Sequence, residues 1–509
     1  MTYGTPSRHP ALGMRVVANE HPELLAELPV SYGAVDPKTQ VRPKHSELGT
    51  NLLKVGATGS GKSTAAKLLM QSVLRPVDGR FGLNFRSLVF DAKTDLIPFL
   101  ASIHLTTDRH VILTNPFDLR CVAWDIADDV RSYLDAVTFA EILVPQTQGE
   151  ENPFWVAAIR DIVSATLHGL NQPDAGGKRR HWTFHQLIAV LDSSAELHEV
   201  LARTHPGRKA LATYLDTPDP RLVGNVRASL NSRVAPHRLV AAAWKHSPQT
   251  FSMRAWAHGG GVLLVGNHYT HRATIERVNN LLLRFAINAL LEQPGELMHA
   301  TTWLFLDELR QAGVFPDFNH LLTQGRSKGL RTLITAQGLS TLRAAFPKDQ
   351  VEEIVANCTE KCVMQLGSPE DAEWAEKLFA TVRRTKVGVH ESDDPRTRNS
   401  YQFNEVIESK LEARAFFELA SAQSTGRGLD AYYHSPGGVH SRTTTPGHIV
   451  RALFDGDEEA LRRVPAFVPR PHEHFEPLGL SPSDRNQLGL SAPESPDERG
   501  NAFRVPPTA

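Results

Sequence analysis

The sequence predicts an α/β protein with a mainly parallel sheet flanked by helices, an inserted all-α domain and a disordered C-terminal tail. Three observations support this fold class. From residue 51 onward, short apolar runs alternate with amphipathic helical stretches, as in parallel sheets covered on both faces. Strand-like runs stop between residues 128 and 234, where helical patterns dominate. Beyond residue 464, proline is frequent and large apolar side chains are few, which favours disorder.

Seven apolar runs are the candidate strands of the sheet. They cover residues 51–55, 87–91, 110–114, 261–265, 301–306, 331–335 and 361–366. Most of them are separated by helical patterns, and the stretch 274–291 is the clearest crossover helix. The inserted helical region contains four further candidate helices, at residues 132–143, 154–170, 183–191 and 195–203.

These patterns divide the chain into five parts. We expect an N-terminal arm, an α/β domain in two segments, the all-α insertion between them, a helical or irregular extension, and the proline-rich tail. The corresponding residues are 1–48 for the arm, 49–127 and 235–400 for the α/β domain, 128–234 for the insertion, 401–463 for the extension and 464–509 for the tail.

Composition bounds the class of protein. The 509 residues leave room for two or three domains, and 41% hydrophobic with 22% charged residues is ordinary globular usage. Lys and Arg (55) nearly balance Asp and Glu (56), so any contact with nucleic acid must come from a local patch. Three cysteines are too few for a disulfide framework, and no apolar stretch reaches membrane-spanning length. We therefore expect a cytoplasmic protein.

A phosphate-binding loop follows the first candidate strand. Residues 56–63, GATGSGKS, fit the pattern G-x-x-x-x-G-K-[ST] and precede a helical stretch, which is the context this motif requires. We expect its backbone N–H groups and the helix N-terminus to hold the phosphates of a nucleotide, Lys62 to reach the β- and γ-phosphates, and Ser63 to ligate Mg²⁺. The predicted nucleotide-binding residues of this loop are Gly56, Ala57, Thr58, Gly59, Ser60, Gly61, Lys62, Ser63 and Thr64.

Two acidic residues end the apolar run 301–306. Asp307 is the expected second protein ligand of Mg²⁺, and Glu308 is the expected general base that polarises the attacking water. Such a pair favours nucleotide hydrolysis coupled to mechanical work over phosphate transfer to a small metabolite. The alternative for Glu308 is a solvated carboxylate at the end of a strand.

Two further residues are candidates for catalysis. Gln337 is expected at the end of the strand that contains the run 331–335, where it could sense the γ-phosphate or a neighbouring subunit. Arg326 lies in the basic turn that precedes that run and is a candidate arginine finger supplied to a neighbouring subunit, although a lone loop arginine is more often a solvated surface charge. The segment 91–95, DAKTD, closes another strand, so its charges either line the site or form an ion pair at the strand end.

Eleven short motifs follow one another along the chain. They are the P-loop, DAK at 91–93, NPFDLR at 115–120, AWD at 123–125, NPFW at 152–155, FSMRAW at 251–256, LDEL at 306–309, GRSKG at 325–329, AQ at 336–337, NCT at 357–359 and LGSPEDAEW at 366–374. In these motifs and their order the chain resembles the type IV secretion coupling proteins of the TraD/TrwB kind, conjugative DNA-transfer ATPases related to FtsK and HerA. The resemblance covers roughly residues 50–385.

The resemblance implies a RecA-like nucleotide-binding domain, an all-α domain matching the insertion, and a hexameric ring around DNA. It also implies that Asp307 and Glu308 form the Walker B pair and that Arg326 and Gln337 act across the subunit interface. ATP, Mg²⁺, single- or double-stranded DNA, and relaxase or relaxosome proteins are then the expected cofactors and partners. The function implied is ATP-driven movement of DNA, or of a DNA–relaxase complex, toward a secretion channel.

This sequence departs from the family pattern at its beginning. Family members typically start with transmembrane helices, whereas here the P-loop starts at residue 56 with no such segment before it. The resemblance therefore implies recruitment to the inner membrane through a separate membrane-anchored channel subunit. Two alternatives stay open: a nucleotide-gated docking platform for relaxase or effector protein, and a soluble DNA motor of a mobile element or defence system without secretion.

Overall fold

The computed structural model describes most of the chain between residues 51 and 491. The described residues are 51–74, 86–146, 152–292, 302–312, 318–379, 381–390, 400–409, 411–421, 428–435, 439–445, 459, 462–477 and 479–491. The expected N-terminal arm, residues 1–48, lies outside them. The chain divides into two compact units, which we call the sheet unit (residues 1–113, 256–267 and 284–467) and the helical unit (residues 114–255, 268–283 and 468–509).

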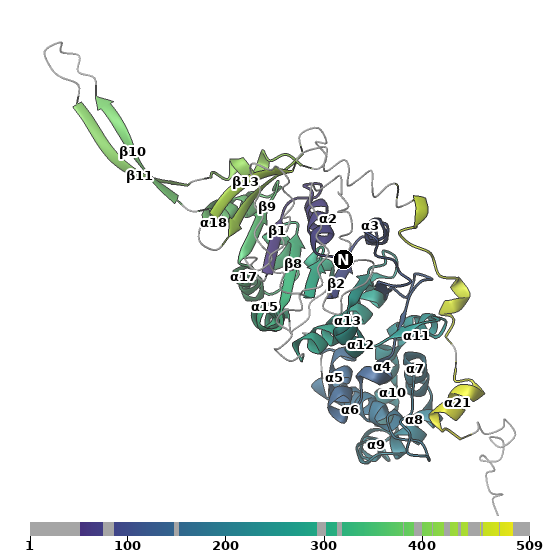
Figure 1. Cartoon of the computed structure of the whole chain (residues 1–509). Coiled ribbons are helices and arrows are strands. Elements are labelled where there is room, and N and C mark those ends of the chain that lie inside the picture. Colours follow the sequence, from purple (N-terminus) through teal and green to yellow (C-terminus); the bar gives the residue numbers. More distant parts are fainter. Residues whose placement is uncertain are drawn as a thin grey trace, which may run out of the picture. The chain divides into compact units, whose positions relative to one another are not determined.

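The sheet unit is built around a single large sheet. Its strands are β1 (Asn51–Val55), β2 (Arg86–Asp91), β3 (Val111–Leu113), β6 (Gly261–Gly266), β7 (Thr302–Leu306), β8 (Leu330–Ala336), β9 (Glu360–Val363), β12 (Leu429–Ser435) and β13 (Val439–Thr445). Their order in space is β13-β12-β9-β1-β8-β7-β2-β6-β3 (Figure 1). The pairs from β9 to β3 are parallel, and β12 and β13 add an antiparallel edge. The expected mainly parallel α/β fold is confirmed.

Strand register brings several carboxyl ends to one edge of the sheet. Val55 at the end of β1 pairs with Ala336 at the end of β8 and with Val363 at the end of β9. Leu306 at the end of β7 pairs with Phe90 of β2. Segments that follow these strands therefore emerge side by side, which is where open parallel sheets place their ligand sites.

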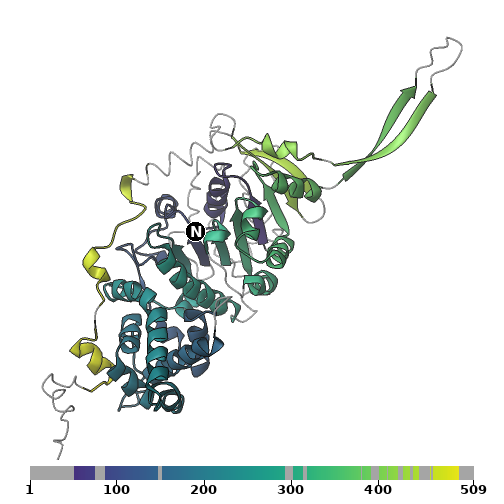
Figure 2. The same ribbon diagram turned by 180° about the vertical axis from the view of Figure 1, so that it is seen from behind.

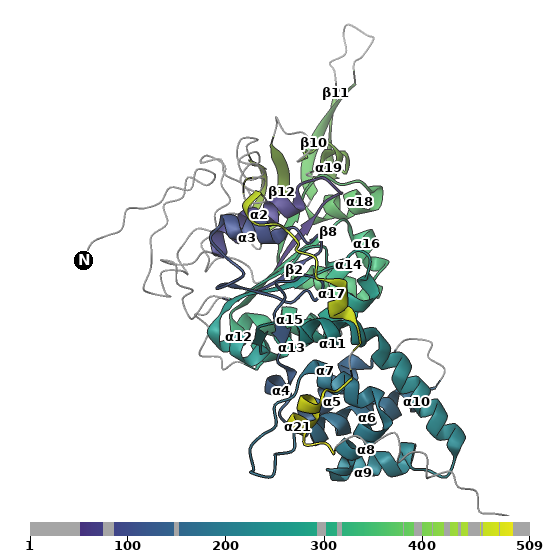
Figure 3. The ribbon, with the colours of Figure 1, turned by 90° about the vertical axis from the view of Figure 1, so that its right-hand side faces the viewer.

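Helices cover both faces of this sheet. They are α2 (Lys62–Val73), α3 (Leu96–Ser102), α14 (Leu309–Ala312), α15 (Phe318–Gln324), α16 (Leu339–Arg343), α17 (Lys348–Asn357), α18 (Pro369–Leu378) and α19 (Arg414–Phe417). The apolar side chains of α2 and α3 pack into one core with alternate residues of the strands, because successive strand residues point to opposite faces. Helices α16, α17 and α18 lie on the other face (Figure 3).

The region expected as a helical or irregular extension, residues 401–463, differs from that expectation. Strands β10 (Thr381–His390) and β11 (Ser400–Ser409) pair as a two-stranded antiparallel ribbon (Figure 2). Further on, β12 pairs with β9 and so extends the main sheet. Leu429, Ala431 and Tyr433 of β12 point into the core of the sheet unit. Apolar residues at alternate positions of β12 are a strand signal in the sequence. The sequence does not indicate the partner strand, which is β9.

The helical unit contains the expected all-α insertion. Its elements are β4 (Ala123–Trp124), α4 (Ile126–Asp129), α5 (Tyr133–Leu143), α6 (Pro153–Leu170), α7 (Phe184–Asp192), α8 (Ser194–Ala202), α9 (His205–Ala210), the π-helical turn Leu211–Leu215, α10 (Pro220–Val234), the turn Ala235–His237, α11 (Arg238–Lys245) and β5 (Thr250–Phe251). Helices α12 (Met253–Gly259) and α13 (Arg272–Leu291) contribute residues to both units.

Local sequence explains where the helices of this unit begin. The side chains of Ser132 and Thr183 accept hydrogen bonds from backbone N–H groups in the first turns of α5 and α7, and each is part of a capping box. Asn152 caps α6, and Pro153 occupies its first turn, where a missing N–H costs nothing. No helix among the described residues has the length and apolar character needed to cross a membrane.

The helical unit is larger than the expected insertion, residues 128–234. It continues through α11, whose residues Val240 to Trp244 are buried, and it includes part of the C-terminal segment. That segment was expected to be disordered from residue 464, but the structure differs over the described part, 464–477 and 479–491, which forms a turn (His472–Phe475) and helix α21 (Pro482–Leu488). Residues 492–509 lie outside the described residues.

The C-terminal segment is held by partners far away in the sequence. Leu488 is fully buried, and Arg470 donates to the carbonyl of Ala243 at 2.9 Å. Gln186 of α7 donates to Asp484 at 2.8 Å, and Arg485 forms an ion pair with Glu196 of α8. The prediction of disorder relied on the small number of large apolar residues in this segment. The structure holds the segment mainly by polar contacts, which composition does not reveal.

Candidate nucleotide-binding site

The P-loop connects β1 to α2 in a conformation that requires glycine. Gly59 and Gly61 have φ values of 80° and 104°, which side chains rarely adopt. A Cβ atom on Gly56 would lie 2.5 Å from Ser60 Oγ, and one on Gly61 would lie 2.5 Å from Leu429 Cδ2. The loop therefore has no room for side chains at these positions, and its backbone curls tightly ahead of the first turn of α2.

Lys62 is mostly buried at the start of α2. Its Nζ donates to the carbonyl oxygens of Gly56 at 2.6 Å and Ala57 at 3.0 Å. Burial lowers the pKa of Lys62, while the nearby carboxylates of Glu308 and Asp307 act in the opposite direction. These carbonyl contacts hold the ammonium group inside the loop.

Ser63 and Asp307 meet at the expected metal position. Ser63 Oγ, in the first turn of α2, donates to Asp307 Oδ2 at 3.2 Å, although the two residues are 244 positions apart. The other carboxylate oxygen, Asp307 Oδ1, accepts a 2.8 Å hydrogen bond from the buried hydroxyl of Thr335. Thr335 belongs to β8, the strand beside β7, so it orients the aspartate from the neighbouring strand.

Glu308 is held in an unusual backbone conformation. Its φ value is 59°, which is uncommon for a residue with a side chain, and its N–H donates to Thr335 Oγ1 at 2.8 Å. The residue is only 8% exposed. Burial raises the pKa of Glu308, while Lys62 and a hydrogen bond from Gln337 oppose that rise. A carboxylate with a raised pKa that faces a pocket has the properties expected of a general base.

The segment after β2 brings Asp91 and Lys93 to the same edge. The buried Asp91 carboxylate accepts from the backbone N–H groups of Lys93, Asp95 and Leu96, which fixes the start of α3. Burial raises the pKa of Asp91 to about 6. Lys93 Nζ donates to Ser63 Oγ at 2.9 Å. The sequence left open whether the charges of this segment line the site or form an ion pair at the strand end. In the structure Lys93 lines the site, whereas Asp91 has a structural role.

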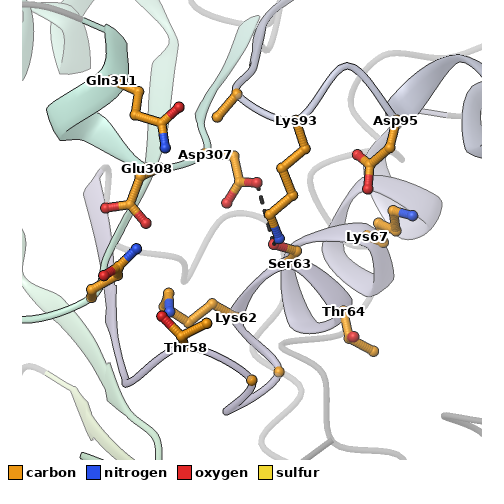
Figure 4. A pocket seen from close by; sticks show the side chains of 14 residues that line it. Thr58, Lys62, Ser63, Thr64, Lys67, Lys93, Asp95, Asp307, Glu308 and Gln311 are labelled. Atoms are coloured by element: carbon orange, nitrogen blue, oxygen red, sulfur yellow. Dashed lines mark hydrogen bonds between the residues drawn. The ribbon is translucent and has the colours of Figure 1, made fainter. Parts of the chain in front are cut away.

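These residues surround a pocket of about 270 Å³ at the carboxyl ends of the strands (Figure 4). The residues that line it are Thr58, Gly59, Gly61, Lys62, Ser63, Thr64, Lys67, Ala92, Lys93, Asp95, Asp307, Glu308, Gln311 and Gln337. Three lysines and three carboxylates are among these lining residues. The structure thus brings together the P-loop, Asp307, Glu308 and Gln337.

The pocket fits a nucleotide with Mg²⁺. Its donor set combines P-loop N–H groups at a helix N-terminus with Lys62, which suits phosphate. The hydroxyl of Ser63 and the carboxylate of Asp307 are hard oxygen ligands of the type Mg²⁺ prefers. The buried Ser60 hydroxyl in the loop has no hydrogen-bond partner among the described residues. Together they could hold a triphosphate and its metal.

Arg326 is not in the pocket. It lies in the 3₁₀ turn Gly325–Lys328 and is exposed to solvent. This turn precedes β8, so it sits at the amino end of that strand, whereas the pocket is at the carboxyl ends. Within one chain Arg326 therefore does not reach the nucleotide position, and its role as a finger stays a prediction about a neighbouring subunit.

Sequence reasoning missed two pocket residues, Lys67 and Gln311, and one supporting residue, Thr335. Lys67 lies one turn after Ser63 on α2 and was detectable from helical spacing. Gln311 follows Glu308 by three positions on α14 and carries the same kind of signal. The bond from Lys93 to Ser63, and the role of Thr335 in orienting Asp307, had no sequence signal because they depend on which strands are neighbours.

Comparisons with known proteins agree with this geometry. A family model described as "Type IV secretion-system coupling protein DNA-binding domain" matches residues 42–410. The coupling protein TraD of Escherichia coli (strain K12) is 25% identical over 224 residues, which are 43% of this chain and 29% of TraD. The match thus spans less than a third of that relative.

Solved structures of the conjugative coupling protein TrwB have the same fold. An unbound form of TrwB lacking its N-terminal 70 residues matches with a TM-score of 0.64 and 18% identity, covering 88% of this chain and 93% of the other. TrwB in complex with ADP and Mg²⁺ matches with a TM-score of 0.61 and 19% identity, covering 88% and 93%. TrwB has also been solved with a non-hydrolysable ATP analogue.

Proposed function

We propose, because the chain belongs to the family of type IV secretion-system coupling proteins, that it is an ATPase that moves DNA, or a DNA–relaxase complex, toward a secretion channel. The observation that carries this proposal is the pocket in which the P-loop faces Asp307, Glu308 and Gln337. Complexes of TrwB with ADP and Mg²⁺ and with an ATP analogue support nucleotide binding there.

Five residues of the pocket then have defined tasks. Lys62 leaves the loop carbonyls and donates to phosphate oxygens, while the loop N–H groups hold the β-phosphate. Ser63 and Asp307 would hold Mg²⁺, which would neutralise charge on the phosphates. Glu308 accepts the proton of the attacking water, and its raised pKa brings it closer to the pH at which it works. Gln337, hydrogen-bonded to Glu308, reports the state of the γ-phosphate to β8.

The DNA partner and the oligomer belong to the same proposal. DNA is supported by the family description, and a motor that tracks phosphates should lose affinity steeply with salt. A homo-hexamer is supported by the exposure of Arg326 outside the pocket of its own chain, since a neighbouring subunit could receive it. Relaxase and a membrane-anchored channel subunit are the proposed protein partners, the latter recruiting this chain to the inner membrane.

The test is ATP hydrolysis with and without DNA, in the unaltered chain and three variants. We expect DNA to stimulate hydrolysis. Lys62→Ala should lose nucleotide affinity, whereas Glu308→Gln should keep it and lose about 10²- to 10⁴-fold in rate. Asp95→Asn, which changes a carboxylate on the opposite side of the same pocket, is the matched control and should retain most of the rate.

Two results would contradict the proposal. Hydrolysis that DNA does not stimulate, together with tight binding of a relaxase or effector, would favour a docking platform over a motor. Native mass measurement of the same samples with an ATP analogue and DNA tests the ring, and a strict monomer would remove the role of Arg326 in a neighbouring site.

A further inference from the structure

Lys93 brings a second ammonium group, in addition to that of Lys62, close to the expected metal position. Its Nζ lies 2.9 Å from Ser63 Oγ, and that hydroxyl in turn lies 3.2 Å from Asp307 Oδ2 (Figure 4). An ammonium group, a hydroxyl and a carboxylate thus form one chain of hydrogen bonds across the pocket. The arrangement joins three elements of the sheet unit: the segment after β2, the first turn of α2 and the end of β7.

The backbone around Lys93 is fixed, so this contact is built into the fold. The Lys93 N–H donates to the buried Asp91 carboxylate at 3.2 Å. The next residue, Thr94, has a φ value of 58° and its hydroxyl donates to the carbonyl of Asn267 at 3.0 Å. A turn held at both sides directs the lysine side chain toward α2. Lys93 itself is exposed at the pocket, so its ammonium group can change partners without unfolding anything.

Lys93 and a metal ion require the same oxygen of Ser63. The hydroxyl has one hydrogen and two lone pairs, and in the structure the hydrogen points to Asp307 while a lone pair accepts from Lys93. Mg²⁺ needs an oxygen lone pair in a close octahedral shell. It also repels an ammonium group at hydrogen-bond distance from its ligand. Binding of Mg²⁺ at Ser63 therefore favours the departure of Lys93 through charge repulsion.

Lys93 balances part of the acidic charge in the pocket. Asp307 and Glu308 are adjacent carboxylates, and Lys62 is turned toward the carbonyls of its own loop. Lys93 is the lysine that is hydrogen-bonded to the Ser63–Asp307 pair. It thus compensates acidic charge at the position where a divalent cation would do the same.

We propose that Lys93 is a placeholder for Mg²⁺: it occupies the Ser63–Asp307 position in the nucleotide-free protein and gives way when Mg²⁺ arrives with the nucleotide. Lys93 is on this view a positioning residue, which keeps Ser63 and Asp307 aligned between catalytic cycles. The inference rests on the proposed nucleotide-binding function and extends it. It predicts that the contribution of Lys93 depends on whether Mg²⁺ is present.

The experiment measures the affinity of the full chain for ADP and for a non-hydrolysable ATP analogue, in excess Mg²⁺ and in EDTA. In Lys93→Met the ratio of the dissociation constant in EDTA to that in Mg²⁺ should rise about tenfold, the size expected for a charge-assisted hydrogen bond. Without Mg²⁺ the phosphates face two uncompensated carboxylates, whereas with Mg²⁺ the metal replaces the lost charge. Lys67→Met is the matched control, because Lys67 lines the same pocket and packs against Phe99. Its ratio should not change.

Each result of these binding measurements supports or overturns the proposed role of Lys93. A Lys93→Met variant that weakens binding equally in both conditions, or not at all, overturns the placeholder role while leaving nucleotide binding intact. A change of similar size in Lys67→Met would show a general charge effect and overturn it as well. If the unaltered chain binds no nucleotide in Mg²⁺, the proposed function falls and the role of Lys93 falls with it.

Discussion

Asp129 in the helical unit and Asp307 in the sheet unit show how similar groups acquire different roles. Asp129 accepts from the indole N–H of Trp124 at 2.6 Å and from the backbone N–H groups of Met253 and Arg254 at 2.7 and 3.0 Å. All three donors are fixed parts of the fold. Asp307 accepts from the hydroxyls of Ser63 and Thr335, and the first of these can rotate away.

The hydrogen-bond donors around an acidic residue thus indicate its role. A carboxylate saturated by rigid donors away from a cavity stabilises the fold, and burial raises its pKa without chemical consequence. A carboxylate held by a rotatable hydroxyl at the wall of a pocket is prepared to exchange that hydrogen bond for a ligand. Three predictions test this distinction, in decreasing order of expected effect.

Replacing Asp129 should affect stability alone. Asp129→Ala leaves the indole N–H and two backbone N–H groups without their acceptor, so we expect the free energy of unfolding to fall by at least about 3 kcal/mol. Denaturant unfolding measures this. Asp128→Ala, at the neighbouring and more exposed carboxylate, is the control and should stay within about 0.5 kcal/mol of the unaltered chain. Weakened nucleotide binding by a folded Asp129→Ala chain would break the distinction.

Lys54 extends the comparison to buried cations. It lies fully buried in β1 and donates to the carbonyl of Ala65 at 3.0 Å, and burial lowers its pKa to about 8. Between pH 8 and the ordinary lysine pKa of 10.5, the unfolded chain binds more protons at this residue than the folded chain does. The free energy of unfolding of the unaltered chain should therefore rise with pH, relative to Lys54→Met, by about 1.4 kcal/mol per pH unit.

The control for Lys54 is a buried arginine of the helical unit. Arg470 donates to Ala243, Asp118 and Ser247, and an arginine stays charged throughout this pH range. Arg470→Met should thus show no such slope relative to the unaltered chain, although it should be less stable at every pH. A flat difference for Lys54→Met between pH 8 and 10 would mean that Lys54 keeps its ordinary pKa.

Thr335 should show the smallest effect and the most specific one. Thr335→Val removes the hydroxyl that orients Asp307 and accepts a hydrogen bond from the backbone N–H of Glu308. We therefore expect hydrolysis to slow about tenfold, with nucleotide affinity nearly unchanged. Thr335→Ser restores the hydroxyl and should recover most of the rate. A slow Thr335→Ser variant beside a Thr335→Val variant of unchanged rate would show that packing of the methyl group matters rather than the hydroxyl.

Much of the fold and site could be predicted from local sequence. Strand, turn and helix at the P-loop are contiguous in the sequence, so the structure of residues 51–73 could be predicted from local patterns. The apolar runs that became β1, β2, β3, β6, β7, β8 and β9 are continuous because both faces of a parallel sheet are buried. Asp307 and Glu308 could be placed because they follow such a run directly.

Other features depended on partners that sequence does not reveal. The tail around α21 is fixed by Gln186, Glu196 and other residues about 300 positions away, and β12 by the free edge of β9. The position of Arg326 at the amino end of β8 also followed only from the direction of that strand in the sheet.

The sequence by itself thus determined an α/β chain with a phosphate-binding loop, a paired acidic site and a helical insertion, because these features are written in short contiguous patterns. Only the tertiary structure decided which hydrogen bonds link them. The alignment of β1, β2, β7 and β8 brings Lys93, Ser63, Asp307 and Thr335 into one chain of contacts, and such contacts arise from strand order rather than from any local preference.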